Sequence, residues 1–203
     1  FRVCLKAVPC CGIWITSNNV IIFMRMRMGG KVIWITGLSG AGKTTLAEGL
    51  VSRLKNLKLN PILLDGDALR QVCSDETPSR YDRKQRRVAG LRYSKICHIL
   101  ASQGFTVVIA TISMFKEIHN WNRENLPGYL EVYLKVPMSE LRERDKNKIY
   151  SRFENGQIED VAGLDIAVDE PANSDLVFEF DKTKSPSDLA DLLMEAVKAR
   201  GYP

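Results

Sequence analysis

Residues 37–45 read Gly37-Leu38-Ser39-Gly40-Ala41-Gly42-Lys43-Thr44-Thr45, and the first eight match the pattern G-x-x-x-x-G-K-[ST] at every fixed position. The glycines allow successive backbone N–H groups to turn toward a bound phosphate, and the following helix directs its positive dipole end at the same point. In this pattern the lysine reaches the β- and γ-phosphates, and the next hydroxyl suits a magnesium ion. We therefore expect residues 37–45 to bind ATP, with Lys43 in a catalytic role and Thr44 as the Mg²⁺ ligand.

The residues on either side of this loop predict the elements that the motif requires. Residues 31–36 (KVIWIT) are an apolar run of strand length, and the apolar residues from Leu46 to Leu54 recur at helical spacing. A strand, the loop and a helix therefore follow one another in the order that phosphate-binding loops need. This context favours a functional loop over a chance glycine-rich turn.

Apolar runs of strand length alternate with segments of helical pattern along the rest of the chain. Such alternation predicts a parallel sheet that is covered on both faces and joined by right-handed crossovers. We therefore predict an α/β fold, the P-loop NTPase three-layer sandwich, with a five-stranded parallel sheet and helices on both faces. The expected strands are 31–36, 61–64, 105–110, 129–136 and 176–180.

Further helices are expected at 84–103, at 114–125, from Pro137 into the charged stretch 142–152, and from Ser185 to Gly201. The last helix begins with a capping serine, a first-turn proline and an early acid. The side chains expected on the buried faces are Val88, Leu91, Ile96, Ile99 and Leu100 in the helix 84–103, and Leu189, Leu192, Leu193, Ala196 and Val197 in the final helix.

Composition and charge narrow the class of protein. The chain has 203 residues, of which 45% are hydrophobic, and this is enough for one domain with one core. Residues 1–30 hold four of the 29 basic residues and none of the 24 acidic residues. The remaining chain, with 25 basic against 24 acidic groups, is nearly neutral, which argues against polymeric nucleic acid as a partner.

Residues 1–29 fit none of the expected elements and stay unassigned, as an N-terminal extension of a domain at 30–203. Their longest apolar run, Val20 to Met24, is too short for a membrane span. Cys73 and Cys97 lie outside this extension, and no paired spacing indicates a zinc site or a disulfide framework. We expect a cytoplasmic protein without a membrane partner.

Ligands of parallel α/β folds bind at the carboxyl ends of the strands, where Gly37, Asp65 and Thr111 are expected together. Either Asp65 or Asp67 could take a proton from an attacking hydroxyl or hold magnesium. The alternatives are that Asp65 only hydrogen-bonds the loop and that Asp67 caps the turn. Four arginines follow in the sequence, namely Arg70, Arg83, Arg86 and Arg87. Their planar guanidinium groups suit phosphate or sulfate oxygens, although any single one is equally well explained as part of a solvated helix face.

Several motifs resemble those of adenylylsulfate kinases in order and approximate spacing. They are GLSGAGKTT (37–45), LDGDALR (64–70), Asp82-Arg83, ATIS (110–113), Arg144-Asp145 with Tyr150, and Gly163-Leu164-Asp165 with Glu170-Pro171. The resemblance covers residues 31 to about 200. It implies transfer of the ATP γ-phosphate, with Mg²⁺, to the 3′-hydroxyl of adenylylsulfate, a small-molecule nucleotide. The polar stretch 147–173 would be the lid, and because family members are commonly dimers the resemblance also implies a homodimer.

The same resemblance implies roles for individual residues. Asp65 and Asp67 would act near the acceptor hydroxyl, and Arg70 and Arg83 would hold the substrate. Ser113 matches a serine recorded in this family as a phosphoserine intermediate, although direct in-line transfer needs no such step. The expected substrate-binding residues, including Ile112 in the adenine pocket, are Asp67, Arg70, Arg83, Arg86, Ile112, Ser113, Lys148 and Val161.

Four positions depart from the family pattern. Arg86 stands in place of an asparagine and Met114 in place of a proline. Asn147 replaces a lid lysine, with Lys148 beside it, and Val161 replaces the aromatic residue that stacks on the acceptor adenine. Loss of that platform removes about 1–3 kcal/mol of base stacking. The ATP side of the site is thus intact, and the acceptor side is altered.

This pattern suggests a divergent branch. Residues 110–118 (ATISMFKEI) and 121–125 (WNREN) resemble kinases found with surface-polysaccharide genes. One of these, cytidine diphosphoramidate kinase, phosphorylates a cytidine nucleotide, and a smaller pyrimidine tolerates loss of the aromatic platform. We place adenylylsulfate first as the acceptor, since its motifs are the broader match, and the cytidine nucleotide second. A non-catalytic nucleotide-binding switch is a third interpretation, against which the presence of Lys43, Thr44, Asp65 and Asp67 argues.

Overall fold

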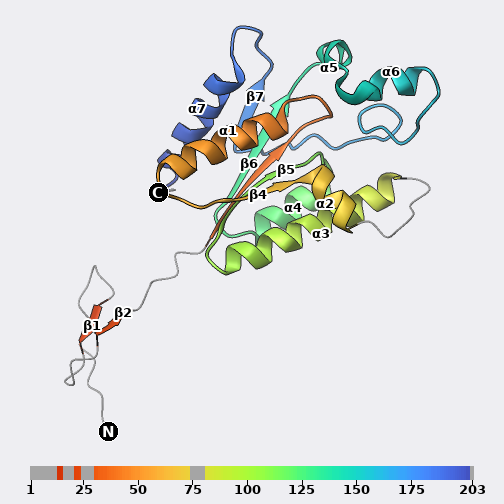
Figure 1. The fold of residues 1–203 in the computed structure, drawn as a ribbon. Coiled ribbons are helices and arrows are strands. Elements are labelled where there is room, and N and C mark those ends of the chain that lie inside the picture. The colour runs from red at the N-terminus through yellow and green to blue at the C-terminus, as the bar shows by residue number, and fades with distance from the viewer. Residues whose placement is uncertain (1–12, 16–20, 24–29, 74–80, 202–203) are drawn as a thin grey trace.

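A computed structural model describes residues 13–15, 21–23, 30–73 and 81–201 of the chain. Its centre is a five-stranded parallel sheet, as predicted (Figure 1). The strand order is β4-β5-β3-β6-β7. The bounds are β3 at Lys31–Thr36, β4 at Ile62–Asp65, β5 at Thr106–Ala110, β6 at Tyr129–Lys135 and β7 at Leu176–Glu179.

Helices cover both faces of this sheet. On one face lie α1 (Lys43–Asn56) and α7 (Pro186–Ala199), and on the other lie α3 (Arg83–Ser102) and α4 (Lys116–Asn125) (Figure 1). The alternation along β3 explains the two cores, because Ile33 and Ile35 join the cluster of α1 and α7, whereas Val32 and Trp34 join that of α3 and α4. The predicted three-layer sandwich is confirmed.

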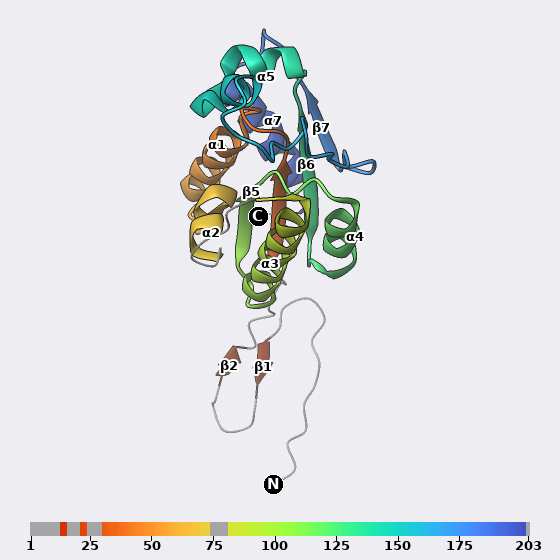
Figure 2. The same ribbon diagram turned by 90° about the vertical axis from the view of Figure 1, so that its right-hand side faces the viewer.

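The remaining helices lie near the carboxyl ends of the strands. The helix α2 (Gly66–Cys73) follows β4 directly and was not predicted. Figure 2 shows α5 (Met138–Arg144) beyond the end of β6, and Figure 1 shows α6 (Ile149–Glu154) beside α5. The short 3-10 helix η1 (Lys146–Lys148) lies between these two helices in the chain. The stretch 147–173 expected as a lid therefore begins with helical turns.

Helix ends follow local sequence signals. Ser185 accepts a hydrogen bond from the N–H of Asp188, whose carboxylate accepts the N–H of Ser185, so the predicted start of α7 is confirmed as a capping box. Asp82 caps α3 by accepting the N–H of Gln85 at 2.8 Å. This cap fixes where α3 begins, and thereby where its first-turn arginines lie.

The predicted buried faces of two helices are partly wrong. Val88 and Ile99 of α3 and Leu192 of α7 are exposed, and Phe105 lies outside β5 and is also exposed. The buried face of α3 consists of four small residues and one tyrosine: Gly90, Tyr93, Ser94, Cys97 and Ala101. On α7 the buried positions include Ala190 and Met194 in place of Leu192. The largest apolar side chains were thus a poor guide to helix rotation.

Residues 1–29 had no predicted structure. Within them, β1 (Ile13–Ile15) and β2 (Ile21–Phe23) pair antiparallel as a separate two-stranded sheet. Across the described part of the chain, no helix combines the length and apolar character that a bilayer crossing requires.

Candidate active site

A cavity of about 1080 Å³ opens at the carboxyl ends of β3, β4 and β5. The loop after β3, the Asp65-Gly66-Asp67 turn after β4 and the residues 110–113 after β5 all contribute to its wall. The predicted meeting of these three strand ends at one site is confirmed, and it follows from their parallel order in the sheet.

The loop at 37–45 has the backbone of a phosphate cradle. Gly40 and Gly42 adopt φ values of 78° and 97°, in the left-handed region that favours glycine. Gly42 is the N-cap of α1 and gives it no side-chain cap, so the first N–H groups of the helix remain directed at the cavity. Lys43 lines the cavity, and its Nζ donates to the carbonyl of Leu38 at 2.8 Å. The loop can therefore receive an anionic ligand at a helix N-terminus.

Asp65 connects the loop to the second strand. Its Oδ2 accepts the Thr44 hydroxyl at 2.9 Å, and its Oδ1 accepts the N–H groups of Asp67 at 2.9 Å and Ala68 at 3.3 Å. Both carboxylate oxygens are therefore engaged, one by the residue expected to bind Mg²⁺ and one by the start of α2. The alternative in which Asp65 hydrogen-bonds the loop is thus part of the observed geometry.

Asp67 differs from Asp65 in its surroundings. Its side chain is 80% exposed, and it faces Arg70 at 3.5 Å in an i,i+3 pair on α2. Both residues line the cavity. A carboxylate in this position is accessible to a substrate in the cavity, whereas that of Asp65 is already occupied by three donors.

The four candidate arginines separate into two groups. Arg70 and Arg86 line the cavity, and their guanidinium carbons lie 5.3 Å and 4.4 Å from the centre of the Tyr81 ring. Arg83 instead donates to the Ala167 carbonyl and pairs with Asp169 at 3.3 Å. Arg83 is not among the cavity-lining residues in the described part of the chain, so its expected substrate contact stays a prediction.

Arg87 is the fourth, and it pairs with Glu117 at 3.2 Å. It too lies outside the cavity wall formed by the described residues. Arg87 is therefore better described as part of a solvated helix face than as a substrate contact, because its side chain is half-exposed and is paired with Glu117 of α4.

Ile112 and Ser113 both line the cavity at the end of β5. Ser113 is 7% exposed with φ of 25°, and its hydroxyl lies 2.8 Å from that of Thr111. Gly90 of α3 makes room for this turn, because a Cβ there would lie 3.1 Å from the Ser113 hydroxyl oxygen and 2.3 Å from the Ile118 side chain. The serine is thus held by its neighbours, and a covalent role for it stays a prediction.

The expected lid contributes Val161 and Asn147 to the cavity, but Lys148 is not part of the wall formed by the described residues. Asp165 holds the loop that carries Val161 by accepting the N–H groups of Asp160 at 2.7 Å and Val161 at 2.6 Å. The Gly-Leu-Asp motif is explained by this turn, which brings residues 158–161 over the cavity.

Sequence reasoning missed the residues at the other end of the cavity. Arg144 donates to the Gly40 carbonyl at 3.2 Å, and its guanidinium carbon lies 4.9 Å from the centre of the Phe180 ring. Phe180, Lys184 and Pro186 extend the wall from there toward α7. The buried Tyr150 donates to the Ser39 carbonyl at 2.8 Å, so α5 and α6 are both tied to the phosphate loop. The motif Arg144-Asp145 with Tyr150 was the feature of the sequence that could have indicated these contacts.

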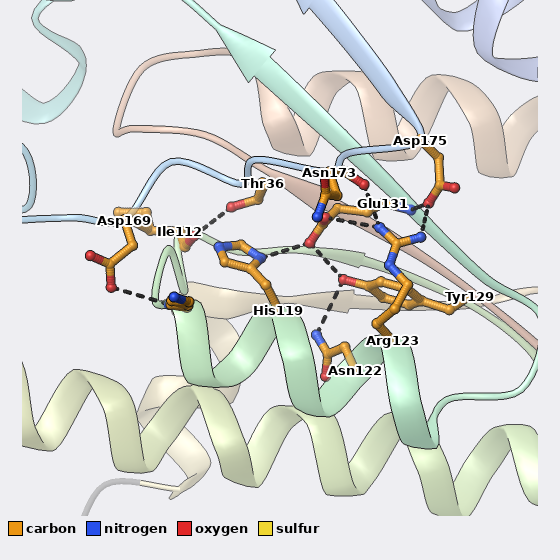
Figure 3. Close-up of polar contacts among 11 residues, drawn as sticks. Thr36, Ile112, His119, Asn122, Arg123, Tyr129, Glu131, Asp169, Asn173 and Asp175 are labelled. Carbon is orange, nitrogen blue, oxygen red and sulfur yellow. Dashed lines mark hydrogen bonds and ion pairs between the residues drawn. The ribbon is translucent and has the colours of Figure 1, made fainter.

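A buried polar network behind the site was also missed (Figure 3). Glu131 of β6 is 2% exposed and accepts the Tyr129 hydroxyl at 2.8 Å and Arg123 at 3.2 Å, and its Oε1 lies 2.6 Å from Nδ1 of His119. Arg123 also binds Asp175 at 2.8 Å. Burial and the nearby Glu131 carboxylate raise the pKa of Tyr129. The feature of the sequence that could have indicated this network is a glutamate, Glu131, within a mostly apolar strand.

This network connects α4 to the chain that follows the expected lid. Arg123 donates to the Asn173 carbonyl at 2.8 Å, and at the other end of α4 the Asp169 carboxylate accepts the N–H of Lys116 at 3.1 Å (Figure 3). Phe115 gives α4 no side-chain cap, so Asp169 takes that role from a distant part of the sequence. The segment 169–175 is therefore held against α4 at two points.

A glycine-rich loop that leads from the first strand of a parallel sheet into the N-terminus of a helix is the arrangement of the P-loop kinases. The sequence pattern of the adenylylsulphate kinase family matches residues 29–179. The chain belongs to that family.

Two curated relatives show the range of activities in the family. The cytidine diphosphoramidate kinase of Campylobacter jejuni is 41% identical over 152 residues, covering 75% of this chain and 87% of the relative. The adenylyl-sulfate kinase of Pseudomonas aeruginosa is 37% identical over 158 residues, covering 75% and 78%. Among solved structures, the Mycobacterium tuberculosis APS kinase in complex with AMPPNP and APS matches with a TM-score of 0.76 and 26% identity, covering 83% of this chain and 98% of that one.

Proposed function

We propose that this chain transfers the γ-phosphate of ATP to a ribose 3′-hydroxyl of a nucleotide acceptor. The observation that carries the proposal is the hydrogen bond between Thr44 of the phosphate loop and Asp65 of β4, which puts the nucleotide cradle and a carboxylate pair in one cavity. Family membership supports ATP as the phosphate donor. Phosphoryl transfer depends mainly on positioning and charge neutralisation, and these residues supply both.

ATP would bind with its phosphates on the N–H groups at the start of α1 and beside Lys43. The base end would extend along Arg144, Phe180 and Lys184, which line the cavity on the side of α7. In this arrangement Lys43 exchanges its bond to the Leu38 carbonyl for a phosphate oxygen. Since Arg144 and Tyr150 already bind carbonyls of the loop, α5 and α6 would keep the cradle in shape.

The residues present fit a magnesium ion. Mg²⁺ usually binds one or two protein oxygens together with substrate phosphates. Thr44 and Asp65 offer such a pair on the cavity wall, 2.9 Å apart. When bound, the ion would neutralise charge on the β- and γ-phosphates. Asp65 would act by orienting Thr44, and the more accessible Asp67 would accept the proton of the acceptor hydroxyl.

The acceptor has two candidates. Adenylylsulfate is supported by the family match and by relatives such as that of Pseudomonas aeruginosa. Cytidine diphosphoramidate is supported by the Campylobacter jejuni relative and by two cavity residues that depart from the adenylylsulfate kinase pattern, Arg86 and Val161. The homodimer, the lid motion and the cytoplasmic location expected from the sequence stay predictions.

A coupled kinase assay that measures ADP release with each acceptor tests the proposal. We expect acceptor-dependent turnover that Lys43→Ala abolishes, because the variant loses the positive charge that would neutralise the transferred phosphate. Lys55→Ala is the matched control, since Lys55 is exposed near the other end of α1. Circular dichroism establishes that both variants fold. Full activity in Lys43→Ala, or ADP release that ignores both acceptors, would contradict the proposed function.

A further inference from the structure

Arg86 occupies the wall of the cavity between α3 and the segment 158–161. Its guanidinium carbon lies 4.4 Å from the centre of the Tyr81 ring, and the cavity passes directly beside both side chains. This end of the cavity is remote in the sequence from the phosphate loop. It is the end at which Arg70 and Asp67 also lie, so an acceptor nucleotide rather than ATP would contact it.

The side chain of Arg86 is held in one orientation. Its Nε donates to the Tyr81 carbonyl at 3.0 Å, and one Nη donates to the Asp160 carbonyl at 2.5 Å. Burial lowers the pKa of its guanidinium, yet arginine remains protonated at any physiological pH. These two bonds use two of the five N–H groups of the guanidinium, and for the other three, which belong to both Nη atoms, no acceptor is recorded among the described residues. Arg86 is thus a pre-oriented donor at a cavity wall.

A guanidinium offers donors alone, and this restricts which base edge can lie against it. Arginine pairs best with two adjacent acceptors, as in its bidentate contact with guanine O6 and N7. The two edges of adenine that carry N1 or N7 place the N6 amino donor next to that acceptor, so one arginine donor would face another donor. Cytosine instead presents O2 and N3 side by side, and its N4 amine follows in line.

The neighbours of Arg86 supply the complement to that amine. Glu159 and Asp160 line the same part of the cavity, and both carry carboxylates. If one of these carboxylates lies in line with the arginine donors, the two together form a row that matches the acceptor, acceptor, donor order of cytosine. The edge of guanine that carries O6 and N7 has no amino group beside it, so it matches this row less completely.

We propose that Arg86 reads the base of the acceptor nucleotide and selects cytosine over adenine. This inference rests on the proposed kinase function and names the acceptor class that the altered side of the site would take. Val161 agrees with it, because an aliphatic side chain covers a small pyrimidine without the aromatic platform that a stacked purine uses.

A structural role for Arg86 is the competing explanation, since its bond to Asp160 also ties α3 to the segment 158–161. The two roles give different results in a comparison of acceptors. Loss of a purely structural tie lowers turnover with every acceptor by the same factor. Loss of a base contact changes the ratio between acceptors.

The experiment measures kcat/KM of the full chain with ATP and three acceptors: cytidine diphosphoramidate, its 3-deaza analogue and adenylylsulfate. The 3-deaza analogue replaces the N3 acceptor by a C–H group. Arg86→Gln is the test variant, because an amide offers one donor and one acceptor and so fits adenine. Lys84→Gln is the control, since it removes one exposed positive charge from the same helix outside the cavity wall.

We expect the unmodified chain to prefer cytidine diphosphoramidate over both other acceptors. Arg86→Gln should reduce the preference over adenylylsulfate on the order of 5- to 150-fold, the worth of one bidentate arginine–base contact. It should also remove the penalty for the 3-deaza analogue, while Lys84→Gln leaves both ratios unchanged.

An acceptor ratio that is identical in the unmodified chain and in Arg86→Gln overturns the inference but leaves the kinase function standing. Preference of the unmodified chain for adenylylsulfate overturns it as well. Absence of phosphorylation with every acceptor overturns the proposed function and the inference together.

Discussion

Replacing Glu131 by glutamine changes one buried atom in the network behind the active site. Glu131 is 2% exposed, and its two oxygens face three partners, namely His119, Tyr129 and Arg123. The amide of Glu131→Gln keeps one oxygen, which can still face His119 and Tyr129. Its NH₂ group then points at Arg123, so two donors oppose each other where a charged pair lay 3.2 Å apart.

The expected loss follows from these contacts. A hydrogen bond to a charged group contributes about 1.5–3 kcal/mol. Arg123 keeps its bond to Asp175 at 2.8 Å and is 39% exposed, so its charge is not stranded and the lower part of that range applies. We expect Glu131→Gln to lower the free energy of unfolding by about 2 kcal/mol, which corresponds to about 4–8 °C in Tm. Glu131→Ala should lose roughly 4–6 kcal/mol, because Tyr129 and His119 then also lose their acceptor.

Thermal unfolding followed by circular dichroism measures these values. Glu195→Gln is the matched control, since Glu195 is exposed on α7. A double-mutant cycle with Arg123→Gln should give a coupling energy of roughly 1–3 kcal/mol between the two positions. The reasoning is refuted if Glu131→Gln unfolds within about 0.5 kcal/mol of the unmodified chain, which is the range of ordinary surface substitutions.

Two further predictions concern the carboxylate pair and a buried thiol. Asp65→Asn should raise the Mg²⁺ concentration needed for half-maximal turnover, since Asp65 orients Thr44. Asp67→Asn should instead lower kcat by about 10²–10⁴-fold at saturating Mg²⁺. Equal effects of both variants on both quantities would contradict this division of roles. Burial raises the pKa of Cys97 to about 12, so the thiol ionises first in the unfolded chain as the pH rises through 8.5–9.5. Folding stability should therefore fall by about 1 kcal/mol across that range in urea titrations, and Cys97→Ala should not show this part of the fall; an unchanged pH dependence would refute it.

The sheet and the ATP side of the site could be predicted because their determinants are local. The phosphate loop is one contiguous stretch whose glycines set the backbone, and the strand before it is a continuous apolar run. Burial faces of helices were predicted less well, because helix rotation depends on what the helix packs against. Val88 and Ile99 are exposed, and the side of α3 that carries Gly90 and Ala101 is buried instead, with Gly90 against Ser113 and Ile118.

The acceptor side could not be predicted at the level of single side chains, because its wall comes from separate parts of the chain. Arg83 and Arg86 lie one turn apart on α3, and the sequence gives them equal claims on a substrate. The fold separates them, because Asp169, 86 residues beyond Arg83, binds that guanidinium while also capping α4. Arg86 remains at the cavity because the backbone carbonyls of Tyr81 and Asp160 orient its guanidinium there, while the carboxylates of Asp160 and Asp165 also attract its charge. Arg83 donates to a carboxylate, whereas the hydrogen bonds of Arg86 within the described part of the chain go to backbone carbonyls. The chemistry of the partners, which only the folded chain reveals, is therefore what makes Arg86 the stronger candidate for contact with the acceptor.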